Sequence, residues 1–161
     1  MPSTPDRTTV RAAIEELSGK LCTNLATDPP TAAKPFRRVA VGSGGFAEYP
    51  RPFLTLMLAR AKPVGTTQGD KLIQVGMILR IVTDIADVDP HGPILDTIGA
   101  LDDYLDSVID SGVIEGAEGF DDRAWSFDYP ESTVGPRVAA ATATQSFVVK
   151  VEREHNRVPA S

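Results

Sequence analysis

This sequence lacks several features that would tie it to the cell exterior, to a membrane or to nucleic acid. Its single cysteine, Cys22, cannot form an internal disulfide, which excludes a secreted scaffold held together by disulfides. No apolar run reaches the length of a membrane span. Lys and Arg total 16 against 22 for Asp and Glu, and the net charge of −6 argues against a dedicated nucleic-acid binder, which needs a basic face.

The N-terminal stretch MPSTPDRTTV has proline and polar residues where a signal peptide would carry a charged and then an apolar segment. We therefore expect a protein that is made in the cytoplasm and used there or in a particle assembled there. The 161 residues indicate one domain with enough chain to bury a core. We expect this domain to span residues 1–153, followed by a flexible tail at 154–161.

Two stretches have the three-to-four spacing of apolar residues that predicts amphipathic helices. The first is expected to start with Thr4 as its N-cap and Pro5 at the favoured first position, and to end before Pro29. The second covers residues 94–112, and Asp89 is placed to accept the free N–H groups of its first turn. The expected apolar faces are Val10, Ile14, Leu17, Leu21 and Leu25 in the first helix and Ile94, Ile98, Leu101, Leu105 and Val108 in the second.

Alternating apolar residues predict strands between and after these helices. A short strand begins near FRRVAV, and FLTLMLARA and KLIQVGMILRIVTDI form a long hairpin whose Gly-containing loop, residues 63–71, projects beyond the sheet. RAWSFDYPE and VAAATATQSFVVKVER are the last two strands. The order helix, three strands, helix, two strands predicts an α+β fold, with a mostly antiparallel sheet of about five strands packed against two helices on one face.

The residues that usually carry catalysis do not form a recognisable constellation. Neither His91 nor His155 lies near a Ser or Cys in a nucleophile context, and Cys22 flanks the apolar stripe of the first helix, where packing is the favoured role. VGSGGF, at 41–46, follows a strand but precedes neither a Lys-Ser/Thr pair nor a helix, so a flexible loop is favoured over a phosphate site. We predict no catalytic, cofactor-binding or metal-binding residue and do not expect an enzyme.

Two further clusters have both a structural and a functional interpretation. DVDPHG, at 87–92, would offer two aspartates and a histidine to a metal, but no second ligand-rich segment matches it, and a strand exit before a helix is favoured. Trp125, Phe127 and Tyr129 alternate in the fourth strand, where neighbouring acidic residues would repel phosphates. We therefore expect these aromatics to form a ladder in the core.

The second helix carries aspartates on the side opposite its apolar stripe. This solvated side lacks the cleft that general acid–base catalysis needs, but it can meet basic residues of a neighbouring subunit, because opposite charges register contacts. Basic residues flank the strands near the loops at 42–51 and 63–71. The predicted subunit-interface residues are Asp96, Asp103, Asp106 and Asp110 on the helix and Arg37, Arg38, Arg51, Arg60 and Lys62 near the loops.

The chain runs from an N-terminal amphipathic helix through PRPFLTLMLAR, a Gly-containing loop, QVGMILRIVTDI and GPILDTIGALDDYLDSVID to RAWSFDY and ATQSFVVKVE. This order resembles that of the tail terminator (tail completion) proteins of long-tailed bacteriophages. The resemblance covers roughly residues 8–153 and rests on element order and texture, because no diagnostic motif is present.

The resemblance implies a small α+β subunit of a hexameric ring that needs no cofactor. Such a ring caps the growing tail tube, stops its polymerisation and later meets the head–tail connector. The implied partners are further copies of the chain, the tail tube protein and connector or neck proteins, all in the virion and away from membranes. No sequence-specific nucleic acid is implied, although DNA would pass through the lumen. The loops at 42–51 and 63–71 would be free to reach either the lumen or neighbouring rings.

Other interpretations remain open at this stage. Tail tube and head–tail connector proteins share a similar size and part of this topology. An enzyme or small-ligand domain would be a monomer with a pocket between the sheet and the helices, and an antitoxin-like regulator would co-purify with a single non-virion protein. Long strands with exposed edges are a liability for a monomer but suit a protein that pairs with its own copies, which favours assembly.

Overall fold

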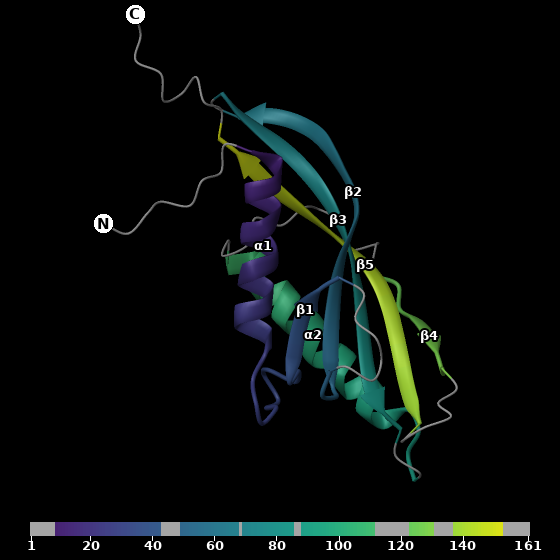
Figure 1. Cartoon of the computed structure of the whole chain (residues 1–161). Helices are drawn as coiled ribbons and strands as arrows, with labels where there is room; N and C mark the ends of the chain where they lie inside the picture. The colour runs from purple at the N-terminus through teal and green to yellow at the C-terminus, as the bar shows by residue number, and fades with distance from the viewer. Residues whose placement is uncertain are drawn as a thin grey trace, which may run out of the picture.

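The computed structural model describes residues 9–42, 49–67, 69–85, 88–111, 123–130 and 137–152, and it confirms the predicted α+β fold. The five strands form one sheet in the order β1-β2-β3-β5-β4 (Figure 1). The tail predicted at 154–161 lies outside the described residues. The elements are α1 (Val10–Leu25), β1 (Arg38–Val41), β2 (Phe53–Thr67), β3 (Asp70–Asp84), α2 (Gly92–Ser111), β4 (Ser126–Asp128) and β5 (Val138–Val151).

Helix α1 begins where a side chain satisfies one of its first free N–H groups. The Thr9 hydroxyl accepts a hydrogen bond from the Ala12 N–H at 3.1 Å, so Thr9 is the N-cap. The prediction of Thr4 as the N-cap is wrong, because the helix starts later, where Thr9 supplies the acceptor. The buried face consists of Ala13, Leu17, Ser18, Leu21 and Leu25, whereas Val10 at the first position is 37% exposed.

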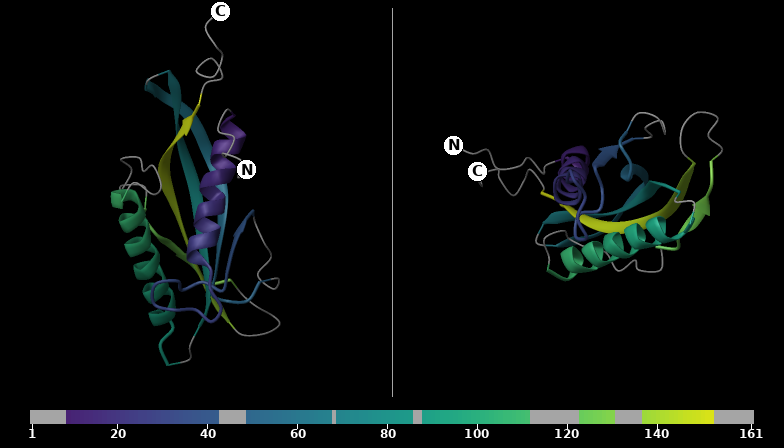
Figure 2. Two further views of the ribbon diagram at one scale, coloured as in Figure 1. Left: turned by 90° about the vertical axis from the view of Figure 1, so that its left-hand side faces the viewer. Right: turned by 90° about the horizontal axis from the view of Figure 1, so that it is seen from below.

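Strands β2, β3 and β5 form the framework of the sheet. β2 pairs with β3 and β3 with β5, both in antiparallel fashion and along most of their lengths. β1 adds a short parallel edge beside Phe53–Leu56, and β4 adds a short antiparallel edge beside Ala140–Thr142. The sheet is therefore mixed but mostly antiparallel, as predicted, and it twists strongly along its length (Figures 1 and 2).

Both helices pack on one face of this sheet. Odd-numbered residues of β3, from Ile73 to Ile81, belong to the same buried cluster as Leu17 of α1 and Leu101 of α2. Since successive side chains of a strand point to opposite faces, this cluster lies on a single face, which we call the helix face. α1 contacts β1 and β5, and α2 contacts β3 and β5, so the two helices cover different parts of this twisted face (Figure 2).

The opposite side of the sheet, which we call the open face, has a small buried cluster at one end. The cluster contains Phe53, Val82, Val138 and Ala140, and the ring of Tyr49 packs edge-on against Phe53 with centroids 5.4 Å apart. No helix of the described part of the chain covers this face. The remainder of the open face is therefore available to solvent or to another molecule.

Helix α2 is positioned by its first turn and by its apolar stripe. The Asp89 carboxylate accepts a hydrogen bond from the Gly92 N–H at 2.9 Å, which confirms the predicted capping role. The side chain of Val108, predicted to extend the stripe, lies outside the described residues. The buried stripe is formed by Ile94, Ile98, Leu101 and Leu105, as predicted.

The hairpin differs from the prediction at its tip. A projecting loop is predicted at 63–71, but β2 continues to Thr67 and β3 begins at Asp70. Register shifts at Leu58/Arg60 and Pro63/Gly65 accommodate, within the strand, the proline and glycine that suggested a loop. The projecting part is therefore strand rather than loop.

The aromatic segment also differs from the prediction. The regular strand is limited to Ser126–Asp128, and Trp125 is the one aromatic of this segment that packs against the main core. Phe127 and Tyr129 are 44% and 46% exposed, so the predicted core ladder is wrong. The physical reason is that β4 is a short edge strand, with a described neighbour on one side only.

Candidate functional site

The longest continuous exposed stretch of strand in the described residues lies in the outer part of β2, residues 57–67, which we call the β2 arm. Beyond Leu56, where the pairing with β1 ends, no described strand lies along the outer edge of β2 (Figure 1). Every residue from Met57 to Thr66 is exposed. An edge of this kind presents N–H and C=O groups that can bond to another chain.

The β2 arm carries apolar and basic side chains but no acidic ones. Its pairing with β3 places Met57 and Lys62 on the open face of the sheet. Met57 is 39% exposed, and Lys62 is exposed with no ion pair in the described part of the chain. Arg60 lies over Gly76, where an added Cβ would be 3.0 Å from the Arg60 Cγ, so the glycine allows the arginine stem to lie close to this face.

The same arm has features that limit indiscriminate pairing. Two register shifts interrupt its ladder, and Pro63 has no N–H to donate. Arg60 and Lys62 would repel the same residues of a second arm. The β2 arm therefore suits a partner with negative charge better than an identical strand.

Helix α2 exposes an acidic side that we call the α2 ridge, formed by Leu95, Asp96, Gly99 and Asp103. α2 contains five aspartates and no Lys or Arg. By contrast, α1 pairs its charges within the helix, through i,i+4 ion pairs of 2.9 and 3.2 Å. Within the described residues, Asp96 and Asp103 have no ion pair, so this side of α2 keeps its negative charge.

Gly99 has no steric role within the part of the chain that the structure describes. A Cβ added there would meet no atom within 4 Å. Glycine inside a helix costs about 1 kcal/mol relative to alanine, so this residue lowers stability with no compensating contact in the described chain. Gly19 of α1 is also exposed, with no atom within 4 Å of an added Cβ, and it provides a matched comparison.

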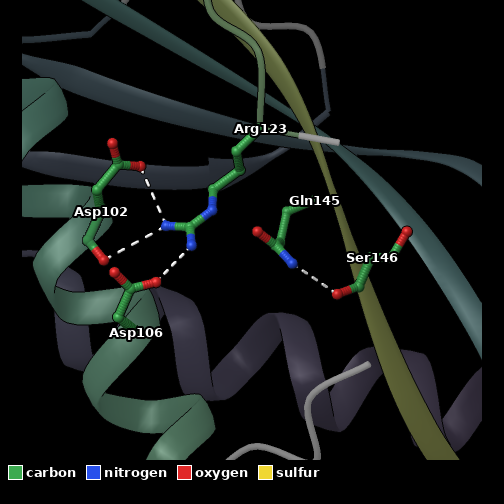
Figure 3. A network of polar contacts seen from close by, with 5 residues as sticks. All are labelled: Asp102, Asp106, Arg123, Gln145 and Ser146. Carbon is green, nitrogen blue, oxygen red and sulfur yellow. Dashed lines mark hydrogen bonds and ion pairs between the residues drawn. The ribbon is translucent and has the colours of Figure 1, made fainter. Parts of the chain in front are cut away.

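Arg123 joins another side of α2 to the segment that leads into β4. Its Nη1 donates to Asp102 Oδ1 at 3.1 Å and to the Asp102 carbonyl oxygen at 3.3 Å, and its Nη2 donates to Asp106 Oδ1 (Figure 3). The Arg123 side chain is 8% exposed, whereas those of Asp102 and Asp106 are 37% and 52% exposed. We call these three residues the Arg123 clamp. Asp106, predicted to meet another subunit, is therefore already paired within its own chain.

Neither Asp102 nor Arg123 was among the predicted site residues. The available signal was that Arg123 is the only Lys or Arg between Arg80 and Arg137, and that it follows two aspartates one helical turn apart. A single basic residue that follows two aspartates of a helix is a reason to expect an ion pair between its segment and that helix.

Burial raises the pKa of Asp102 despite its ion pair. Loss of solvent is the largest effect, and the positive charge of Arg123 only partly offsets it. At neutral pH, ionised Asp102 therefore has a higher free energy in the folded protein than it has in water. The clamp orients α2 and the segment before β4, and part of its Coulombic gain is used in compensating the desolvation of Asp102.

Gln145 is a fully buried polar residue on the helix face of β5. Its Nε2 donates to the carbonyl oxygen of Ser146 at 2.7 Å, so the side chain satisfies an acceptor of its own strand (Figure 3). Cys22 packs against the main core, and burial raises the pKa of its thiol, with the charge of Arg38 opposing this shift. A protonated, packed thiol agrees with the structural role predicted for Cys22.

The structure separates the basic residues of the predicted interface into two groups. In the described part of one chain, no predicted acidic residue pairs with a predicted basic one, and the Asp110 side chain lies outside that part. Arg60 and Lys62 belong to the β2 arm. Three others make contacts near β1: Arg51 pairs with Asp84, the Arg38 guanidinium lies 4.9 Å from the centroid of the Tyr49 ring, and Arg37 lies 4.0 Å from Asp28.

The other sequence clusters do not assemble into a site in the described chain. Most of VGSGGF lies outside the described residues, as do Asp87 and His155. His91 is described, and its Nδ1 lies 3.1 Å from the Tyr129 hydroxyl. Among the described residues, no three His, Cys, Asp or Glu side chains are grouped as a metal site would require, and no helix has the length and apolarity to cross a membrane.

No protein-family model matches this chain, and no curated protein matches it. A functional proposal therefore depends on the β2 arm, the α2 ridge and the resemblance in element order.

Proposed function

We propose that this chain is a structural subunit of the virion of a long-tailed bacteriophage, where it acts as a tail terminator. Its copies form a ring, a hexamer by the resemblance, that caps the tail tube and joins it to the head–tail connector. In this role the protein catalyses no reaction and needs no cofactor. DNA passes through the lumen of the ring without being recognised by sequence.

The β2 arm is the observation that carries this proposal. A strand that continues beyond its last outer neighbour, with its side chains exposed, gains little apolar burial when one chain folds alone. Contact with a second molecule would bury it. Met57, Leu58 and Val64 are 39%, 48% and 47% exposed, and they supply apolar area for such a contact.

The packing between the helices and the sheet supports assembly over the small-ligand alternative. Leu17 of α1, Leu79 of β3 and Leu101 of α2 belong to one continuous buried cluster. A binding pocket for a polar ligand at that interface would have to displace this cluster. The remaining alternative within the same class is another neck or tail protein, such as a connector or a tube subunit.

Met57→Glu tests the assembly part of the proposal, because it places a charge on an exposed apolar position of the open face of the arm. We expect the unaltered protein to show rings in negative-stain electron microscopy and Met57→Glu to show none. Val88→Glu is the matched control, since Val88 is 97% exposed outside the regular elements, and it should leave the rings intact. If Met57→Glu still forms rings, the open face of the arm is not part of the interface.

Labelling of phage particles tests the position in the virion. A gold-conjugated antibody raised against this chain should mark the junction between head and tail. Label along the whole tail would indicate a tube protein. Absence of label from intact and from detergent-opened particles, with the chain present only in the cell lysate, would contradict the virion role.

A further inference from the structure

The β2 arm and the α2 ridge have opposite charges and a similar order of apolar and charged side chains. On its open face the arm presents an apolar side chain, Met57, followed by basic residues ending in Lys62. The ridge presents an apolar side chain, Leu95, which is 52% exposed, followed by the flat position of Gly99 and then Asp103. Each surface therefore has an apolar end and a charged end, and the charges have opposite sign.

The lengths of the two surfaces also correspond. Residues 95 and 103 of a helix are separated by about 12 Å along its axis, at 1.5 Å per residue. Residues 57 and 62 of a strand are separated by about 15 Å, at 3.3 Å per residue and allowing for one bulge. A lysine side chain spans the remaining difference, so both ends can be matched in one docking geometry.

The two surfaces cannot meet within one chain. Met57 and Lys62 point to the open face, whereas α2 packs on the helix face, which is the opposite side of the sheet. The arm also reaches toward the end of the sheet away from the N-terminal half of α2 (Figure 1). A contact between two different, complementary surfaces is a head-to-tail contact between copies, and such contacts close into rings when the rotation permits.

We infer that the open face of the β2 arm of one copy docks on the α2 ridge of the next, with Lys62 beside Asp103 and the strand backbone passing over Gly99. This inference rests on the proposed self-assembly and identifies its contact surfaces. Close approach of a neighbouring strand explains why this position is a glycine, for which the described residues of one chain give no steric reason. The α2 ridge carries aspartates but no Lys or Arg, and in this contact the basic residues of the neighbouring arm compensate its negative charge.

A charge exchange tests the pairing of Lys62 with Asp103. Lys62→Glu and Asp103→Lys should each weaken assembly about tenfold, and the double variant should recover most of that loss because the opposite charges meet again. Lys34→Glu makes the same change of charge at an exposed loop residue and should have no effect. Assembly is measured by mass photometry over a dilution series at low and at high salt. A double variant no better than the single ones would overturn the pairing.

A glycine exchange tests the close approach in a way that a general loss of folding cannot imitate. Gly99→Ala and Gly19→Ala should each raise the melting temperature of the monomer by about 2–4 °C, because alanine favours the helix. Only Gly99→Ala should weaken assembly, since the added methyl group would meet the docked strand. Equal assembly of the two variants would overturn the role of Gly99.

Cross-linking of mixed isotopic copies separates this inference from the proposed function. A zero-length carbodiimide reaction on a mixture of light and ¹⁵N-labelled protein should join Lys62 of one copy to Asp103 of the other. If rings form but the Lys62–Asp103 peptide is absent or always of one isotope, the inference fails and the assembly proposal stands. If the unaltered chain never self-associates, both fail.

Discussion

Replacing Arg123 with alanine should destabilise the folded subunit by about 2 kcal/mol. Removing one partner of a buried ion pair typically costs about 3–5 kcal/mol, because it leaves uncompensated charge. Here the arginine side chain is 8% exposed, but Asp102 and Asp106 are 37% and 52% exposed and can regain water, so the expected cost is smaller. For a chain of this size the melting temperature should fall by about 6 °C.

Urea unfolding at fixed protein concentration measures this effect, because the linear extrapolation gives the free energy of unfolding and an unchanged slope shows that the unfolded state is the same. Arg123→Lys keeps the charge but not the fork that reaches both aspartates, so about half of the loss is expected. Arg11→Ala is the control, since the Arg11–Glu15 pair is 88% and 65% exposed, and its removal should leave the midpoint unchanged. The reasoning would be refuted if Arg123→Ala and Arg11→Ala had the same midpoint.

Three further predictions concern the fold. Asp102→Asn should become more stable relative to the parent as the pH rises above 3.8, the ordinary pKa of aspartate. The pKa of Asp102 is raised in the folded parent, so the folded state favours the protonated acid and the parent loses stability as the carboxylate ionises. A constant difference in urea midpoint from about pH 4 to pH 7 would contradict this. Phe147→Ala, at 0% exposure, should lower the free energy of unfolding by about 3–5 kcal/mol, whereas Phe127→Ala, at 44% exposure, should lower it by under about 1 kcal/mol in the same assay. Equal losses would show that Phe127 is a core residue. Thr9→Ala should lose about 1 kcal/mol and reduce helicity in circular dichroism, whereas Thr4→Ala should change neither if Thr9 is the N-cap.

The sequence predicted those elements whose side chains alternate between buried and exposed positions over a long stretch. Ile73 to Ile81 in β3 and Ile94 to Leu105 in α2 have a clear period, because one face of each element packs against a continuous core. Element order and fold class followed from these periods. The start of α1 was placed too early because Thr4 and Thr9 offer the same hydroxyl, and the sequence does not decide which one starts the helix.

The predicted loop at the hairpin tip failed for a different reason. Pro63 and Gly65 usually interrupt strands, but β-bulges accommodate them here, and a bulge depends on the register of the partner strand. The aromatic ladder failed because periodicity does not show whether a strand has a neighbour on each side. Phe127 alternates like a core residue but lies in a short edge strand.

The candidate site was predicted in part. The acidic side of α2 and the cations of the arm, Arg60 and Lys62, were expected from their spacing in the sequence. The pairing of Asp106 with Arg123 was not, because it joins a helix to a segment that lies 17 residues further along the chain. Such a contact depends on how the segment before β4 lies against α2, and local patterns carry no information about that arrangement.

The solution mass of the unaltered protein tests most directly whether this fold is made to associate with its own copies. Light scattering coupled to size exclusion, repeated across a hundredfold range of concentration, should give a single closed species with a mass about six times the 17.2 kDa of one chain. A mass of 17.2 kDa at every concentration and salt level would contradict the account.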